Sequence, residues 1–171
     1  LETLTGRPYV DVVHERVTTR AGVSRILGGD TAGVHEVRSI GAHPGDGPEL
    51  VELFGRPDLV PKASIGPDAL LSLNHPMVQA AAIPGGGGVG RAADVALTYQ
   101  SFIDNPSPWM RDAVGTIRNV SINASDGTPA NRTIAGYVAG ADGYHLHRWF
   151  PDAPRAFGHH GAGGCIGLAD P

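Results

Sequence analysis

The chain has 171 residues, of which 41% are hydrophobic, and its 13 basic and 17 acidic residues give a formal net charge of −4 at pH 7. This length suits one domain, and the acidic balance and the lack of any Lys/Arg run argue against a surface that binds nucleic-acid phosphates. No apolar run approaches the length of a membrane-spanning helix, and a single cysteine, Cys165, excludes an intramolecular disulfide. The 25 glycines and 14 prolines predict many loops and a small core, which a partner lobe would help to complete.

The first third of the chain predicts one helix followed by a long irregular segment. From Pro8 to Thr18, valines recur at helical spacing, and the proline suits the first turn. Residues 21–70 contain repeated Gly-Gly and Gly-Pro breaks, which are typical of loops. We expect this segment to be a loop-rich, divergent insertion with one short helix around Glu49 to Phe54.

Two helices are predicted in the middle of the chain. The stronger one runs from Gly90 to Ile103 and ends before the Asp104-Asn105-Pro106 break. Its apolar residues predict a broad buried stripe, made of Ala92, Ala93, Val95, Ala96, Tyr99, Phe102 and Ile103. A second, shorter helix is predicted from Trp109 to Ile117.

After Asn119 the pattern changes to short apolar and aromatic runs separated by Gly and Pro turns, which predicts strands. The expected strands are Thr133 to Val138, Tyr144 to Phe150, Arg155 to His159, and Cys165 to Leu168. Helices followed by an antiparallel strand meander make an α+β fold, an antiparallel sheet flanked by helices.

The most informative motif is near the end of the chain, in the run Phe157-Gly158-His159-His160-Gly161-Ala162-Gly163-Gly164-Cys165. Glycines at this density remove Cβ atoms from a segment with strand character. Another backbone or a substrate can therefore approach the main chain closely. Two adjacent imidazoles at such a place indicate a functional site rather than a plain hairpin.

This motif resembles the third conserved box of the β-lactamase-like serine hydrolases, the group of class C β-lactamases, D,D-peptidases and related carboxylesterases. In that family a Lys-Thr-Gly or His-Thr-Gly triplet lies on the strand that lines the active site, and here the triplet is His159-His160-Gly161. Two further stretches are similar to the family in the right order. They are Leu4-Thr5-Gly6-Arg7-Pro8-Tyr9 and Gly86-Gly87-Gly88-Val89-Gly90-Arg91-Ala92-Ala93-Asp94-Val95-Ala96.

The resemblance implies a partial β-lactamase/transpeptidase-like fold and a role for each residue of the box. The catalytic residues would be His159, His160, Gly161 and Ala162. The backbone N–H of Ala162 would help to form an oxyanion hole, and His159 would hold or pass a proton. Because His160 replaces the usual threonine, anchoring of a substrate carboxylate is less favoured, and the resemblance points to a carboxylesterase.

The nucleophile that the family uses is missing from these residues. The family acylates the serine of a Ser-x-x-Lys tetrapeptide and uses a Tyr-x-Asn or Ser-x-Asn for proton transfer. The one lysine, Lys62, has Leu59 three residues before it. Ser72-Leu73-Asn74 and Ser121-Ile122-Asn123 fit Ser-x-Asn, but both come after the position that the family order requires. We therefore expect residues 1–171 to be the C-terminal portion of a hydrolase domain and to be inactive alone.

The expected partners are a small ester or amide substrate and the missing N-terminal part of the same polypeptide, with no nucleic acid, membrane, cofactor or metal. Two other classes of function stay open. One is a non-catalytic binding protein with the same fold. The other is a nucleotide-binding domain, because Gly85, Gly87 and Gly90 formally match a dinucleotide fingerprint. Against it, Pro84 precedes the first glycine, and no strand-like run or well-spaced acidic residue accompanies the loop.

Two site chemistries are weighed and not favoured. His145 and His147 would share one strand face, and a neighbouring strand's histidine could complete a metal site, but no carboxylate joins the pattern. A thiol nucleophile at Cys165 is conceivable beside His159 or His160, although a small residue in such a strand is more often packed.

Overall fold

The structure, a computed structural model, describes residues 1–29, 71–104, 106–123, 127–161 and 165–171. The chain divides into two compact units. The described residues of the first unit are 1–29 and 71–104, and those of the second are 106–123, 127–161 and 165–171. The helix predicted around Glu49 to Phe54 and nearly all of the predicted 21–70 insertion lie outside the described residues.

The first unit begins with helices α1 (Glu2–Thr5) and α2 (Tyr9–Val13), and α2 continues directly into a π-helical turn, η1 (His14–Thr18). The predicted helix from Pro8 to Thr18 is thus confirmed, with Pro8 as the N-cap. The buried hydroxyl of Thr18 lies 2.6 Å from Nδ1 of His14, which holds the wider turn together.

The other described elements of the first unit are a short 3₁₀ turn, η3 (Ser72–Asn74), helix α5 (Pro76–Ala80) and the long helix α6 (Ala92–Asp104). The predicted helix from Gly90 to Ile103 is confirmed, but its predicted buried stripe is wrong in the first two turns. Ala92, Ala93, Val95 and Ala96 are exposed. The buried residues of α6 are Asp94 and Thr98.

The two buried residues of α6 are polar, and Asp94 caps its own helix. Its Oδ2 accepts hydrogen bonds from the backbone N–H of Arg91 at 3.0 Å and from Nε of Arg91 at 3.1 Å. The Arg91 guanidinium and backbone N–H hold the pKa of the Asp94 carboxyl below its usual value. The Thr98 hydroxyl donates to the Asp94 carbonyl at 2.8 Å. These bonds satisfy the buried Asp94 carboxylate and the Thr98 hydroxyl.

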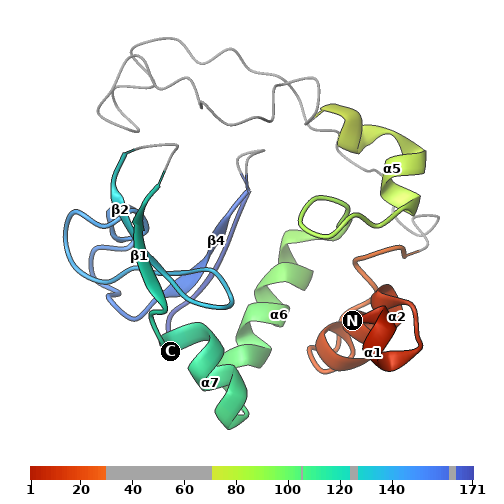
Figure 1. The fold of residues 1–171 in the computed structure, drawn as a ribbon, viewed down its shortest axis with the longest axis horizontal. Helices are drawn as coiled ribbons and strands as arrows, with labels where there is room; N and C mark the ends of the chain where they lie inside the picture. Colours follow the sequence, from red (N-terminus) through yellow and green to blue (C-terminus); the bar gives the residue numbers. More distant parts are fainter. Residues whose placement is uncertain (30–70, 105, 124–126, 162–164) are drawn as a thin grey trace. The chain divides into compact units, whose positions relative to one another are not determined.

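The described residues of the second unit form one helix, five strands and a short 3₁₀ turn, and Figure 1 shows how these elements follow one another. Helix α7 (Pro108–Gly115) is capped by Ser107, whose hydroxyl accepts the Met110 N–H at 3.1 Å. It begins one residue before the predicted Trp109 and ends two residues before the predicted Ile117. Its buried residues, Ala113 and Val114, lie on the helix that contacts β3 and β4.

The five strands form one antiparallel sheet in the order β1-β2-β3-β4-β5, so each strand pairs with its neighbour along the chain. Their bounds are β1 (Asn119–Ile122), β2 (Pro129–Arg132), β3 (Tyr137–Val138), β4 (Phe157–His160) and β5 (Ile166–Ala169). The fold of the described residues is therefore α+β, as predicted.

The last two predicted strands are confirmed as adjacent and antiparallel. Gly158 pairs with Leu168, and His160 pairs with Ile166. Two other strand predictions need correction. Of the predicted strand Thr133 to Val138, only the last two residues form β3, because the rest makes the turn from β2.

The predicted strand from Tyr144 to Phe150 is wrong. This segment consists of turns and the 3₁₀ turn η4 (His147–Trp149), with the Trp149 N–H donating to the Leu146 carbonyl at 3.2 Å. Leu146 is only 1% exposed and is one of the largest side chains that are fully buried. The apolar residues of the segment therefore cover the sheet instead of extending it.

The core of the second unit lies between the sheet and this 139–156 connection. It contains Ala130, Tyr137, Ala139, Leu146 and Ala156, with Phe150, Ala153 and Leu168 packed against it. A core built from so many alanines leaves little space between the connection and the strands. Side chains of the connection are therefore brought against β3 and β4.

Candidate functional site

The candidate site is the end of β4, where His159, His160 and Gly161 follow one another. His159 is exposed, and His160 and Gly161 are half-buried. The Gly161 N–H donates to the Cys165 carbonyl at 2.7 Å and closes the hairpin to β5. This N–H is therefore used within the hairpin. The predicted oxyanion donor, Ala162, lies outside the described residues.

A second histidine reaches this strand end from the 139–156 connection. Nε2 of His145 lies 3.0 Å from Nδ1 of His160, a hydrogen-bond distance. The two ring centroids are 4.5 Å apart, and the rings are tilted by 53°. His145 is 3% exposed, so the pair joins a buried imidazole to one that reaches the surface.

Tyr137 on β3 holds the three imidazoles together. Its ring stacks on His159 with centroids 5.1 Å apart and on His160 with centroids 5.9 Å apart. Its contact with His145 is edge-on at 5.4 Å. Such aromatic contacts restrict how each ring can turn. We call Tyr137, His145, His159 and His160 the imidazole cluster.

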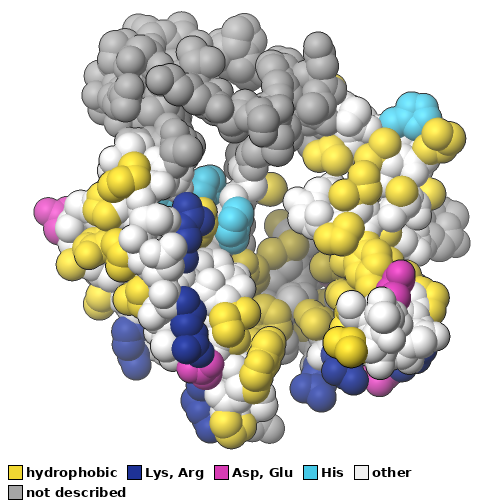
Figure 2. Space-filling model, viewed as in Figure 1, with side chains coloured by type: hydrophobic (Ala, Val, Ile, Leu, Met, Phe, Trp, Pro, Cys, Tyr) yellow, Lys and Arg dark blue, Asp and Glu magenta, His cyan; other side chains and the backbone are white. Residues whose placement is uncertain are grey.

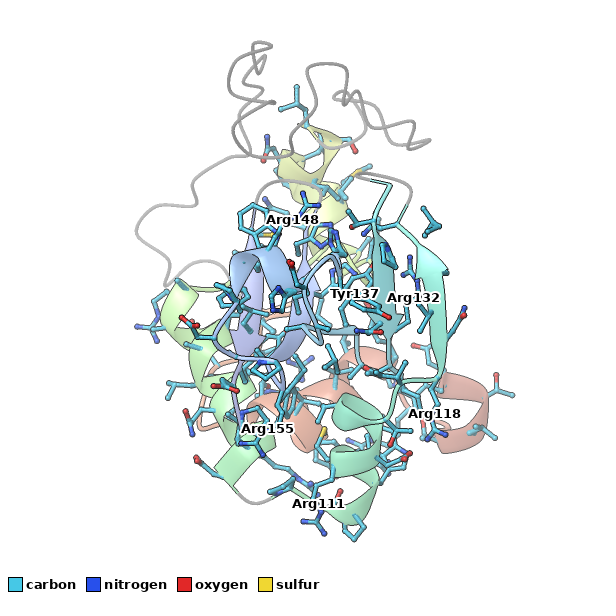
Figure 3. The ribbon with its side chains drawn as sticks, turned by 90° about the vertical axis from the view of Figure 1, so that its left-hand side faces the viewer. Arg111, Arg118, Arg132, Tyr137, Arg148 and Arg155 are labelled. Carbon is cyan, nitrogen blue, oxygen red and sulfur yellow. The ribbon has the colours of Figure 1, made fainter. Side chains whose placement is uncertain are left out.

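Arg132 on β2 extends the cluster toward β1. Its guanidinium carbon lies 4.9 Å from the Tyr137 ring centroid, and one of its N–H groups donates to the Tyr137 hydroxyl at 2.9 Å. Its Nε donates to the Ser121 hydroxyl at 2.7 Å. Figure 3 shows Arg132 and Tyr137 side by side on neighbouring strands. In the space-filling view, histidine side chains gather beside basic ones on the strand-bearing unit (Figure 2).

The glycines around the cluster bring backbones together. A Cβ atom on Gly158 would lie 2.1 Å from the carbonyl oxygen of Gly167 on β5. A Cβ atom on Gly136 would lie 2.5 Å from the carbonyl oxygen of Gly158. Because Gly161 has no Cβ atom, there is room beside it for the thiol of Cys165, which is an exposed free cysteine. Close backbone approach, one of the two expected uses of this glycine-rich run, is thus confirmed for the described residues.

The structure brings together only part of what the sequence suggested. His145 and His147 do not share a strand face, because His145 lies in a turn and His147 begins η4. Nδ1 of His147 faces Asp142 at 3.8 Å instead. Within the described part of the chain, no three His, Cys, Asp or Glu side chains are placed to hold a metal ion.

Sequence reasoning missed the roles of Tyr137, Arg132 and His145. Arg132 and Tyr137 flank a tight turn, and this spacing could have predicted that they pair directly across β2 and β3. Ser121, first considered only as part of a Ser-x-Asn triplet, lies on β1 and accepts the Arg132 bond.

The Gly85 to Gly90 loop lacks the setting of a dinucleotide site. Helix α5 and a turn precede it, and Gly88 makes only an isolated antiparallel bridge with Leu27. All strand pairs among the described residues are antiparallel. The strand–loop–helix unit of a dinucleotide-binding fold is therefore absent from the described part of the first unit.

Comparison of the chain with protein-family models, with curated proteins and with solved structures finds no match. Among the described helices, none combines the length and the apolar character that crossing a membrane requires.

Proposed function

We propose that this chain forms part of a serine hydrolase, a carboxylesterase of the β-lactamase/transpeptidase-like fold. In this proposal the end of β4 lines the substrate site, and a Ser-x-x-Lys segment not contained in these 171 residues supplies the nucleophile. The observation that carries the proposal is the placement of His159, His160 and Gly161 at an accessible strand end. A buried imidazole reaches the same place through the His145–His160 bond.

The chemistry of ester hydrolysis matches what this strand end offers. Attack on the ester carbonyl creates negative charge on its oxygen, and backbone N–H groups aimed at that oxygen stabilise it. The Ala162 N–H would be one such donor, and the N–H of the acylated serine the other. An imidazole can hold or pass a proton near neutral pH, so His159 would assist proton transfer. No cofactor or metal enters this mechanism.

The proposal is tested on the protein produced from its complete reading frame. A fluorophosphonate probe should label a serine covalently, and a short-chain p-nitrophenyl ester should be hydrolysed. Ala162→Pro removes the donor and should lower acylation by about a hundredfold or more. His159→Ala should lower turnover and flatten the pH profile near neutrality, and His160→Ala should change the preference among esters.

His147→Ala is the matched control, because His147 belongs to the same unit and contacts Asp142 rather than the imidazole cluster. It should leave turnover unchanged. The 171-residue chain alone should not hydrolyse the ester. Turnover by that chain alone, or full activity in both Ala162→Pro and His159→Ala with the fold retained, would overturn the proposal.

A further inference from the structure

Arg132 is held in place by the strands on both sides of β2. Its Nε donates to the Ser121 hydroxyl on β1 at 2.7 Å, and its Nη1 donates to the Tyr137 hydroxyl on β3 at 2.9 Å. The guanidinium carbon also lies 4.9 Å from the centroid of the Tyr137 ring, whose π-electrons favour a cation there. The orientation of the Arg132 guanidinium is therefore set by the sheet (Figure 3).

The positive charge of Arg132 has no carboxylate partner among the described residues. The side chain is half-buried, and both groups that accept its hydrogen bonds are neutral hydroxyls. Four other arginines each form an ion pair with an acidic side chain, namely Arg7 with Glu15, Arg25 with Asp11, Arg91 with Asp94, and Arg118 with Asp112. The three imidazoles that contact the same tyrosine add no negative charge. A half-buried charge of this kind favours a counter-ion from solution.

Part of the Arg132 guanidinium is available to such an anion. An arginine carries five N–H groups, and here two of them are bound to hydroxyls. Nη2 donates to no described group, and it is not among the polar side-chain atoms that are buried without a partner, so it reaches solvent. A carboxylate can accept two parallel N–H bonds from one guanidinium. The bonds to Ser121 and Tyr137 can stay in place when it does.

We propose that Arg132 binds the carboxylate of a small ligand through its remaining N–H groups. The single permanent charge at this place matches a carboxylate monoanion, whereas a phosphate dianion is usually met by several charges or by backbone N–H groups. This binding does not depend on the proposed function. The Tyr137 ring also stacks on His159, so a ligand a few bonds long can reach from Arg132 toward the end of β4. Where the proposed function holds, on which this last step rests, the preferred ester carries a carboxylate.

The first test is nuclear magnetic resonance of the protein produced from its complete reading frame, with ¹⁵N-labelled arginine. Sodium acetate is the probe, acetamide is its uncharged counterpart, and sodium chloride at equal ionic strength is the salt control. Acetate should shift the Nε–H signal of Arg132 saturably, acetamide and chloride should not, and inorganic phosphate should bind more weakly than acetate. The absence of a saturable shift with acetate, an equal shift with chloride, or tighter binding of phosphate excludes this carboxylate site.

The second test uses substitutions. Arg132→Gln removes the charge and should weaken acetate binding by about tenfold or more. Ser121→Ala keeps the charge and removes one of the two hydroxyls that fix it, so binding should weaken by about threefold. It serves where Arg132→Gln does not fold. Arg118→Gln is the matched control, because Arg118 already pairs with Asp112, and it should bind acetate like the wild type. Unchanged acetate binding in folded Arg132→Gln, or in Ser121→Ala, contradicts the assignment.

The third test separates this inference from the proposed function. The mono-p-nitrophenyl ester of adipate keeps one free carboxylate, and p-nitrophenyl hexanoate has the same length without it. In an active protein, kcat/KM should be about tenfold higher for the adipate ester, and Arg132→Gln but not Arg118→Gln should remove this preference. If neither ester is hydrolysed but Arg132 binds acetate, the proposed function fails and the carboxylate site stays. If both are hydrolysed but Arg132 binds no acetate, the carboxylate site fails and the proposed function stays.

Discussion

Two glycine-rich stretches of this chain have similar composition and opposite structural roles. In the first, Gly85 to Gly90, the chain turns back on its own neighbours: the Gly87 N–H donates to the Ile83 carbonyl at 2.7 Å, and a Cβ on Gly87 would lie 2.4 Å from the Ile83 nitrogen. In the second stretch, the run from Phe157 to Cys165, the backbone of Gly158 lies close to the carbonyl oxygen of Gly167 on the neighbouring strand β5. A glycine that is crowded by a residue close to it in the sequence belongs to a turn, whereas one that is crowded by a residue of another strand belongs to a packed sheet. The number of glycines does not distinguish the two cases.

The largest effect is expected from Gly158→Ala. The new Cβ would lie 2.1 Å from the Gly167 carbonyl oxygen, so β4 and β5 must separate. We expect the free energy of unfolding to fall by about 3 kcal/mol. Urea denaturation gives the change, and hydrogen exchange of the β5 amides should show where it occurs.

Gly143→Ala is the control within the same unit. Gly143 has a φ of +84° and open space around its Cβ position, so alanine there adds backbone strain without a clash. Its cost should be about 1 kcal/mol. If Gly158→Ala and Gly143→Ala lower the free energy of unfolding equally, β5 moves aside at little cost. The expected difference between the packed sheet and the Gly85 to Gly90 turn is then not observed.

A smaller effect is expected from Gly87→Ala in the first stretch. The clash is with the Ile83 nitrogen inside one turn, which can adjust without parting two strands. We expect about 2 kcal/mol, seen as faster hydrogen exchange around this turn. In Gly86→Ala the Cβ would meet only the Leu73 side chain at 3.3 Å, and the change should stay within about 0.5 kcal/mol. A Gly87→Ala cost above that of Gly158→Ala would reverse the comparison.

A smaller effect than at Gly158 or Gly87 is expected at Asp94, which caps the helix that follows the first stretch. Asp94→Ala removes the acceptor of the Arg91 N–H and should cost about 1 kcal/mol at neutral pH. Because the pKa of Asp94 is lowered in the folded protein, its stabilisation is present above the unfolded pKa, about 3.9, and is lost as pH falls through the folded value.

Urea denaturation between pH 7 and pH 2 measures this dependence. Asp94→Asn keeps an oxygen that can accept the backbone bond but carries no charge, so it should retain part of the stability and lose this acid-dependent part. If the wild type and Asp94→Asn lose stability in parallel below pH 4, other carboxylates carry the acid dependence.

The sequence was most informative where local signals decide the structure. Periodic valines and the Asp104-Asn105-Pro106 break located α2 and α6, and helix α7 was found within two residues at each end. The pairing of β4 with β5 followed from apolar and aromatic residues on both sides of a glycine-rich run. The β-lactamase-like resemblance stays a prediction.

The errors arose where pairing or burial overrides local preference. Strand β2 has the sequence Pro-Ala-Asn-Arg, which has little intrinsic preference for strand, and it forms because β1 and β3 pair with it on both sides. The 144–150 segment has the aromatic residues of a strand, but burial of Leu146 fixes it as a series of turns. The contact of His145 with His160 depends on that same fold-back, so no spacing rule along the chain could reveal it.

The order of the sheet has a consequence for when the imidazole cluster can exist. Strands β1 to β3, and β4 and β5, follow one another after only a few residues of sequence, whereas β3 and β4 are joined by the whole 139–156 connection. Closing this long loop costs more chain entropy than forming any of the short hairpins. His145 belongs to the loop, Tyr137 to the strand before it and His160 to the strand after it. The cluster therefore needs the closure that costs the most chain entropy among the links between these strands, and opening the 139–156 connection would separate His145 from His160.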